Sequence, residues 1–250
     1  MPIDADTRSS IYTLFNKAHT QGQTVMRALQ WEFPNEAYLA NVDNQFTLGP
    51  AILVTPVLEP LVTQVNGTFP GIEAGTRWYD WYTLQPVDAA PQENKSLDAP
   101  LDFINVHVRG GHILPLQQPG YTTTESRQNP FNLLIALSEN SRAHGSLYLD
   151  DGYSLVPNAT KEIDLYYAHS ILTVATRGNF EMPNALANIT IAGFTAADQP
   201  KSVQLCGGCG DGSIDIASFD LQNGTLQITG LEEATSCGVW SSDWRLEIVS

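Results

Sequence analysis

The feature of the sequence that most limits its fold is a series of short hydrophobic runs, each followed by turn-forming residues. The runs are rich in β-branched and aromatic residues, and Gly, Pro, Asn and Asp separate them. Runs of about four to eight such residues are typical of strands, and a regular series of them indicates β-sandwich architecture. They cover residues 51–58, 76–83, 104–110, 131–138, 145–150, 170–178, 186–194, 201–205, 225–231 and 244–250.

The N-terminal part departs from this pattern. Apolar residues recur at the spacing of one helical face between Ile11 and Ala18, and Gly22 follows as a helix-ending residue. The run TVMRALQWEF, residues 24–33, is interpreted as a buried strand that Pro34 ends. The sequence therefore predicts one helix and one strand before a long all-β region, and the fold class is mainly β.

A polar stretch marks the expected division of the β region. The segment YTTTESRQNP, residues 121–130, has no hydrophobic periodicity and ends in proline. The proline- and acid-rich stretch of residues 85–100 is instead expected to be a loop between strands that pair. We therefore expect two β domains on either side of about residue 127.

The charge balance excludes some classes of partner. The formal net charge is −15, whereas nucleic acids and anionic membranes are bound by clustered Lys and Arg. No apolar run approaches the roughly 20 residues that cross a bilayer. No Gly-rich loop opens a helix, so a nucleotide cofactor is unsupported. The sequence predicts no nucleic-acid partner, no membrane partner and no cofactor.

Adjacent carboxylates at Asp150 and Asp151 are the first candidates for acid–base chemistry. Glycoside hydrolysis uses two carboxyl groups that face one cleft, roughly 5 to 10 Å apart. Adjacent residues of a strand point to opposite faces, and Gly152 follows the pair directly. The pattern favours a hairpin turn over a catalytic pair.

The histidines and serines form no recognisable catalytic or metal-binding pattern. His107 and His112 flank Gly110-Gly111, but no HxxxH, HExxH or GxSxG motif occurs. Structural roles in strands are favoured for both histidines. No catalytic, substrate-binding or metal-ligating residue is predicted.

The aromatic run RWYDWYT leaves two interpretations open. Alternation places Trp78 and Tyr82 on one face of a strand and Tyr79 and Trp81 on the other. Packing of both faces in a core is favoured. The alternative is a carbohydrate-binding module without catalysis, which requires Trp78, Trp81 or Trp240 to be exposed on a flat face.

Covalent features suggest an extracellular origin. The three cysteines are Cys206, Cys209 and Cys237, and a zinc site would need more ligands, so one disulfide and one leftover thiol are expected without a fixed pairing. Few lysines and five N-glycosylation sequons favour secretion, although the first ten residues lack the pattern of a signal peptide. The sequons begin at Asn66, Asn94, Asn158, Asn188 and Asn223.

Several long segments, in order, resemble the C-terminal part of glycoside hydrolase family 31, most of all secreted fungal α-glucosidases. They are HTQGQTVMRALQWEFP, NQFTLGPAILVTPVLEP, GTRWYDWYT, INVHVRGGHILPLQQPG, TTTESR and GSLYLDDGYS. The resemblance implies the end of a catalytic (β/α)8 barrel in residues 1–46, a proximal β domain in 47–127 and a distal β-sandwich in 128–250. It also implies that INVHVRGGHILPLQQPG is a pair of proximal-domain strands bent at the glycines, and that YTTTESRQNP is a connector.

The same resemblance implies that this chain lacks the catalytic machinery. In that family an Asp nucleophile and a second Asp, the acid/base, precede the region that the chain resembles. A barrel needs eight strands, and residues 1–46 supply only its end. We therefore expect a part of an α-glucosidase that supports the barrel, is inactive alone, has the missing barrel portion as a partner and meets α-glucosides only through the intact enzyme.

Overall fold

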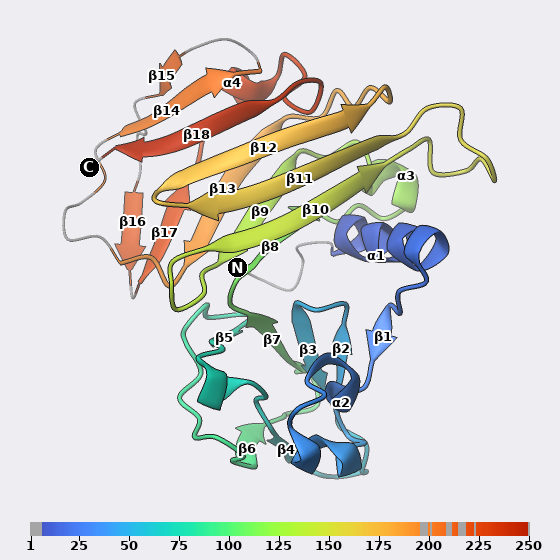
Figure 1. Ribbon diagram of the computed structural model, residues 1–250, viewed down its shortest axis with the longest axis vertical. Coiled ribbons are helices and arrows are strands. Elements are labelled where there is room, and N and C mark those ends of the chain that lie inside the picture. The colour runs from blue at the N-terminus through green and yellow to red at the C-terminus, as the bar shows by residue number, and fades with distance from the viewer. Residues whose placement is uncertain are drawn as a thin grey trace.

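The computed structural model describes residues 7–195, 200, 202–208, 212–214, 219–222 and 224–249. It is mainly β, as predicted, and consists of a large unit above a small unit in Figure 1. Helix α1, Arg8–Gln21, lies beside the large sheet close to the small unit. Within the described residues, no helix has the length and apolar character needed to span a bilayer.

The small unit contains a five-stranded sheet and a two-stranded sheet. The order of the first sheet is β1-β2-β3-β7-β5, and the second pairs β4 with β6. Short helical turns α2, η1 and η2 connect these strands. The bounds are β1 Met26–Arg27, α2 Leu29–Glu32, η1 Ala37–Asn41, β2 Phe46–Leu48, β3 Ile52–Thr55, β4 Gln64–Gly67, η2 Ile72–Ala74, β5 Trp78–Asp80, β6 Lys95–Asp98 and β7 Asn105–Arg109.

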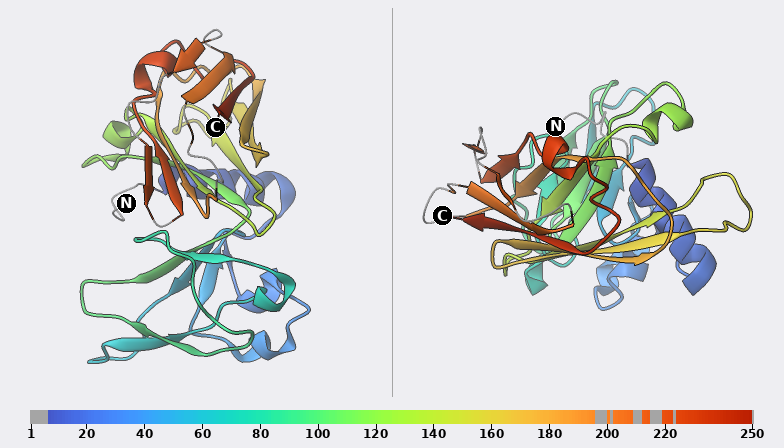
Figure 2. Two further views of the ribbon diagram at one scale, coloured as in Figure 1. Left: turned by 90° about the vertical axis from the view of Figure 1, so that its left-hand side faces the viewer. Right: turned by 90° about the horizontal axis from the view of Figure 1, so that it is seen from above.

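The large unit is one curled sheet with the order β15-β14-β18-β12-β11-β10-β8-β9-β13-β17-β16. Side chains from both halves of this sheet share one hydrophobic core, so the sheet folds over itself as in a sandwich (Figure 2). The bounds are β8 His112–Gln117, α3 Thr123–Ser126, β9 Phe131–Ala136, β10 Ala143–Leu149, β11 Lys161–Ala168, β12 Ile171–Gly178, β13 Leu186–Ala192, β14 Ser202–Gly207, β15 Gly212–Ile214, β16 Phe219–Gln222, β17 Thr225–Ile228, α4 Glu232–Thr235 and β18 Trp244–Val249.

The chain changes sheet at Gly110-Gly111, and the two strands on either side of these glycines, which the resemblance placed in one domain, lie in different sheets. Strand β7 belongs to the small sheet, whereas β8 pairs with β9 and β10 in the large sheet. The Gly110 N–H donates to the Arg77 carbonyl, and the Gly111 N–H donates to the Ala136 carbonyl, both at 2.7 Å. Gly111 has a φ of +90°, which favours glycine and turns the chain from one sheet to the other. The division into domains near residue 127 stays a prediction.

The predicted strand over residues 24–33 is also wrong for most of its length. Only Met26–Arg27 forms a strand, and Leu29–Glu32 forms helix α2. Leu29 and Phe33 lie four residues apart and are buried in the same core, which is helical spacing. The helix that precedes this segment is confirmed, since Gly22 ends α1 in a left-handed conformation.

The two units meet through a shared hydrophobic core. Tyr79 and Trp81 of the small unit pack in this core with Leu116 and Leu134 of the large unit. Trp78 points to the opposite face of β5 and packs in a second core within the small unit. The alternation predicted for the aromatic run is therefore confirmed for Trp78, Tyr79 and Trp81. It is wrong for Tyr82, which lies beyond the end of β5 and packs against the same core as Tyr79 and Trp81. The junction between the units is a packed interface.

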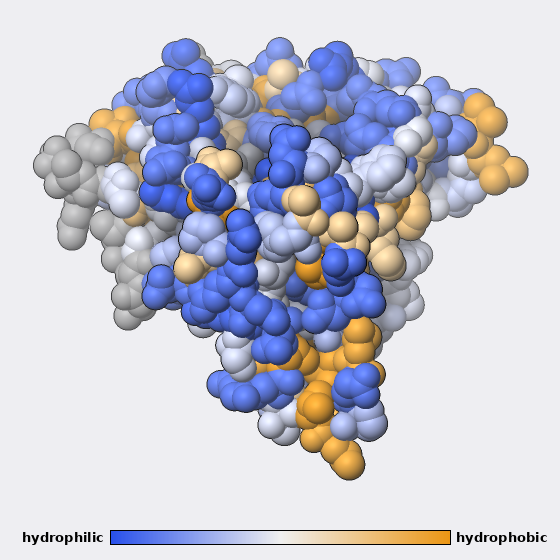
Figure 3. Space-filling model, turned by 60° about the horizontal axis from the view of Figure 1, so that its bottom comes forward, coloured by the Kyte–Doolittle hydropathy of each residue, from blue (hydrophilic) through white to orange (hydrophobic). Residues whose placement is uncertain are grey.

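Apolar side chains are exposed at several places on the surface, and two groups of them lie in loops. Figure 3 shows them gathered at the end of the small unit, where the loops β3–β4 and β6–β7 lie side by side, and Leu61 and Leu101 are fully exposed there. A second group, which includes Leu155 and Val156, lies in the loop between β10 and β11. No single class of partner follows from these exposed groups alone.

Candidate functional site at the junction of the two units

Helix α1 contacts the large sheet through polar side chains. The Ser10 hydroxyl donates to the Pro115 carbonyl at 2.7 Å, and the Thr13 hydroxyl accepts from the Tyr148 N–H at 3.0 Å. Ser10 and Thr13 are the buried residues of this helix. The helix is therefore held by directional hydrogen bonds, which fix its position on β8 and β10.

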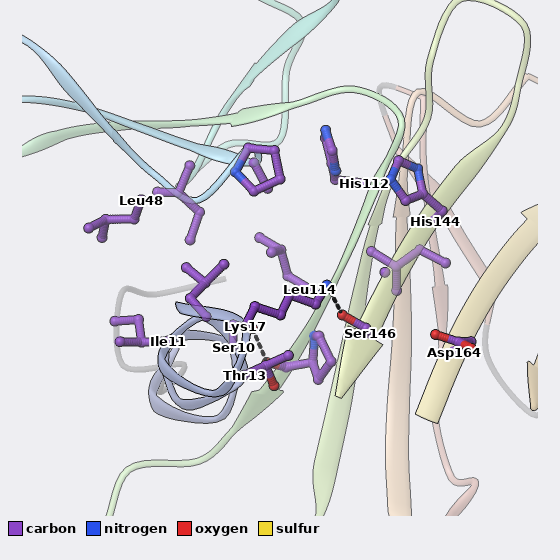
Figure 4. Close-up of a pocket in the computed structure, with 17 residues that line it drawn as sticks. Ser10, Ile11, Thr13, Lys17, Leu48, His112, Leu114, His144, Ser146 and Asp164 are labelled. Carbon is purple, nitrogen blue, oxygen red and sulfur yellow. Dashed lines mark hydrogen bonds between the residues drawn. The ribbon is translucent and has the colours of Figure 1, made fainter. Parts of the chain in front are cut away.

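A cavity of about 190 Å³ lies between α1, β3, β8 and β10 (Figure 4). The Lys17 ammonium donates to the Ser146 hydroxyl at 2.6 Å across this cavity. Burial lowers the pKa of Lys17, and the nearby Asp164 carboxylate opposes that shift. The group is thus an amine with reduced solvation that one hydroxyl holds in place.

Two histidines line the same cavity beside this lysine. The rings of His112 and His144 are 5.0 Å apart between centroids. Burial, and then the charge of His144, lower the pKa of His112, so the neutral imidazole is favoured there. Asp164 is the one carboxylate among the described residues that line this cavity. The cavity offers no carboxylate pair for glycoside hydrolysis.

Asp150 and Asp151 have different environments. Asp150 is buried at the C-terminal end of β10, where its carboxylate accepts from the Tyr12 hydroxyl at 2.9 Å. Burial and this hydrogen bond raise the pKa of Tyr12 to about 12. Asp151 instead accepts from the Ser154 N–H at 3.0 Å within the loop that follows. Asp150 therefore anchors α1, and Asp151 stabilises a turn.

A wide cleft of about 680 Å³ between the units contains two carboxylates, Glu32 and Glu139. Glu32 is held by ion pairs with Arg27 at 2.7 Å and Arg109 at 3.0 Å, while Glu139 is exposed. A general acid of a glycosidase needs an apolar setting that keeps it protonated. An ion-paired group and an exposed group both lack that setting, so the cleft is not a glycosidase active site.

The tryptophans required by the carbohydrate-binding alternative are not on the surface. Trp78, Trp81 and Trp240 are all buried. A flat aromatic platform for sugar rings is therefore not formed by these residues, and their rings serve packing. No group of three or more His, Cys, Asp or Glu within the described part of the chain could hold a metal ion.

The sequon asparagines differ in their environment. Asn66, Asn94 and Asn158 are exposed. Asn188 is half-buried in β13, and its amide donates to the Asn132 side chain at 2.9 Å. Asn223 lies outside the described residues. A glycan can be attached without rearrangement at the first three sites, whereas at Asn188 it would have to displace the bond to Asn132.

Among the cysteines, Cys237 is disulfide-bonded and Cys206 carries a free thiol. Cys209 lies outside the described residues. Cys206 is in β14, where it pairs with Arg245 of β18.

The polar face of α1 was missed from the sequence. Ser10, Thr13 and Lys17 recur at intervals of three and four, which places them on one face of a helix. Ile11 and Leu14, two of the apolar residues that identified the helix, line the same cavity as these polar residues. A stripe of polar residues at helical spacing was therefore a usable signal for a hydrogen-bonded contact.

The comparisons with known proteins agree with this structure. Residues 22–114 match the glycosyl hydrolase family 31 C-terminal domain. The chain is 49% identical to an α-glucosidase of Aspergillus niger and 46% identical to one of Schizosaccharomyces pombe, over 94% and 95% of its length. It spans about a quarter of these relatives, since it covers 24% of each.

Solved structures show the same fold. A glucosidase II α subunit superposes with a TM-score of 0.84 at 22% identity, over 96% of this chain and 27% of that one. A Flavobacterium johnsoniae dextranase superposes with a TM-score of 0.71 at 20% identity, over 97% of this chain and 31% of that one. These likenesses show that the two β units have the fold of the corresponding region of those enzymes.

Residues 22–114 of the chain carry the C-terminal domain of glycoside hydrolase family 31, and the longer match to the α-glucosidases includes this domain. The resemblance seen in the sequence is thereby confirmed.

Proposed function

We propose that this chain is the supporting C-terminal region of a family 31 α-glucosidase and has no glycosidase activity alone. The observation that carries the proposal is the 49% identity over 94% of the chain to about a quarter of an α-glucosidase. In the complete enzyme, hydrolysis of terminal α-glucosidic bonds would use a carboxylate nucleophile and a carboxylic acid/base. The chain would hold the catalytic barrel through its rigid junction of two units.

The described cavities support a structural role for the chain without glycosidase activity. The cavity beside α1 contains one carboxylate, and the cleft between the units contains an ion-paired one and an exposed one. The polar groups at the junction are already bonded to one another, as in Lys17 with Ser146 and Asp150 with Tyr12. Such satisfied networks stabilise a structure and leave few groups for a substrate.

The test is glucose release from maltose. The purified chain is expected to release none above buffer, because it offers no acid and nucleophile facing one sugar. The chain is then mixed or coexpressed with the remaining part of the A. niger relative, and activity is expected to exceed that of the remaining part alone. Glucose release that stays with the isolated chain through successive purification steps would overturn the proposal.

We also propose that the chain is a glycoprotein of the secretory route. The support is the exposure of Asn66, Asn94 and Asn158 and the disulfide at Cys237. When the chain is secreted from a yeast host, glycopeptide mass spectrometry is expected to find glycans at these three asparagines and a much lower occupancy at Asn188. Equal occupancy at Asn188 would contradict the role given to its bond with Asn132.

A further inference from the structure

Two histidines from different parts of the chain form a cross-strand pair at the junction of the two units. His112 begins β8 and His144 lies in β10, and the two residues are register partners where these strands run parallel. Register partners of neighbouring strands project their side chains from the same face of a sheet. Figure 4 shows the two rings side by side, and their centroids are 5.0 Å apart.

The separation of the rings fits one metal ion bound between them. Imidazole nitrogens bind such ions at about 2.1 Å, so two imidazoles at tetrahedral or square-planar angles have ring centroids about 4.5–5.2 Å apart. The separation of 5.0 Å lies inside this range. Aromatic rings that only pack against each other cover a wider range of about 4.5–7 Å. The surroundings of the rings decide between the two interpretations.

The two rings are accessible and lack hydrogen-bond partners within the described part of the chain. Both line the wide cleft of about 680 Å³ between the units as well as the cavity beside α1. His112 is half-buried and His144 is exposed, and no described residue is hydrogen-bonded to either ring. A histidine with a purely structural role inside a junction would ordinarily have such a partner. The ring nitrogens are therefore available to a ligand that enters from the cleft.

We propose that His112 and His144 form a chelating site for a divalent transition-metal ion, with water from the cleft in the remaining coordination positions. Imidazole suits the late first-row metals, and among these Cu²⁺ binds more tightly than Ni²⁺ or Zn²⁺. Two protein ligands are fewer than the four of a structural zinc site. The charges of Lys17 and Arg109 act on His112 and weaken the attraction of a cation. The site is therefore one of moderate affinity, and Cu²⁺ is its best probe.

A bound ion would link two strands that have little other pairing with each other. In the described structure, His112 with His144 is the one register pair between β8 and β10, and the His144 N–H donates to the Gly111 carbonyl at 3.0 Å beside it. Each strand is paired over a longer stretch with another neighbour, β8 with β9 and β10 with β11. A ligand that binds the folded chain in preference to the unfolded chain stabilises it. The ion is therefore expected to raise the temperature of thermal unfolding.

The experiment titrates the full chain with Cu²⁺ and measures binding by calorimetry. Cys206→Ser is the background for all variants, because the free thiol of Cys206 is another possible ligand for copper. In this background His112→Asn and His144→Asn are each expected to weaken the dissociation constant at least about tenfold, since each leaves one imidazole. His169→Asn is the matched control and should bind like the background. His169 is exposed in the turn between β11 and β12, and its φ of +51° suits asparagine.

Two further measurements separate chelation from a change of fold. The electron paramagnetic resonance spectrum of bound Cu²⁺ should show coupling to two imidazole nitrogens in the background chain and to one in each histidine variant. Thermal unfolding without metal should show that both variants fold, and added Cu²⁺ should raise the unfolding temperature of the background more than that of either variant.

Several outcomes would overturn the site. Binding that both histidine variants leave unchanged, or that His169→Asn weakens as much as they do, would place the ion elsewhere. A spectrum with a single imidazole nitrogen in the background chain, or no binding at millimolar Cu²⁺, would also overturn it. None of these outcomes depends on glycosidase activity, so each leaves the proposed function unchanged.

Discussion

Replacing Gly193 with alanine is expected to destabilise the protein by about 3 kcal/mol. Gly193 has a φ of +76°, and a Cβ there would lie 2.1 Å from the hydroxyl oxygen of Tyr79 and 3.0 Å from its Cζ. The left-handed conformation costs a non-glycine residue about 1–2 kcal/mol, and overpacking of a well-packed site adds about 1–3 kcal/mol. Tyr79 cannot move easily, because it is buried and its hydroxyl donates to the Leu137 carbonyl at 2.7 Å.

This position tests the junction because Tyr79 comes from the small unit, whereas Gly193 and Leu137 follow strands of the large unit. Gly230→Ala is the matched control. Gly230 has a φ of +78°, and nothing lies within 4 Å of a Cβ placed there, so only the backbone cost of about 1–2 kcal/mol is expected. Urea unfolding measures the loss of stability in each variant. The difference between the two losses is the steric part of the cost of Gly193→Ala.

The Tyr79→Phe background gives a second check. Removal of the hydroxyl takes away the atom nearest to the new methyl group, so the extra cost of Gly193→Ala should fall in this background. The two changes should therefore couple in a double-mutant cycle. Equal losses for Gly193→Ala and Gly230→Ala, or strict additivity with Tyr79→Phe, would contradict a contact that holds the units together.

The local pattern of the sequence predicted the elements better than their partners. The helix ending at Gly22 and the two faces of the run around Trp78 follow from spacing of three to four or of two residues, which the chain encodes locally. Residues 24–33 were misassigned because a short apolar run does not distinguish a strand from a buried helical turn. The change of sheet at Gly110-Gly111 depends on the strands that pair with β8, which are β9 and β10, and no local pattern specifies them.

The junction shows the same limit more strongly. Its hydrogen bonds join residues far apart in sequence, as in Ser10 with Pro115 and Thr13 with Tyr148, which are separated by 105 and 135 residues. No local sequence pattern predicts which distant residue is the hydrogen-bond partner. Two results follow from the sequence alone, the absence of paired carboxylates and the resemblance to a family. The first concerns what the chain lacks, and the second concerns what it matches. The position of α1 on the sheet required the fold.

The stability of the protein is expected to fall steeply as the pH is lowered from about 6.5 toward 4. His107 is buried in β7, its Nδ1 has no hydrogen-bond partner in the described part of the chain, and the ring of Phe69 packs edge-on at 4.7 Å. Burial lowers the pKa of His107 to about 4, and the nearby Asp80 carboxylate opposes this only in part. The fold therefore requires a neutral imidazole at this position.

The sign follows from proton linkage. Between the unfolded pKa of about 6.5 and the folded pKa of about 4, His107 binds a proton in the unfolded chain but stays neutral in the folded chain. The stability that this group contributes is complete above about pH 6.5 and is lost progressively toward pH 4, by about 3 kcal/mol over the window. His112, whose pKa burial also lowers, adds a loss of the same sign.

Urea unfolding between pH 7 and pH 4.5 measures this loss. The His107→Gln variant should be less stable than the wild type at pH 7, because its amide needs hydrogen bonds that the site does not provide. Its stability should nevertheless fall less with pH, by about 2 kcal/mol over this range, because one titrating group has been removed. His19→Gln, at an exposed position on α1, controls for the loss of a histidine elsewhere in the chain. If the stability of His107→Gln depends on pH as steeply as that of the wild type, the sensitivity to acid does not come from His107.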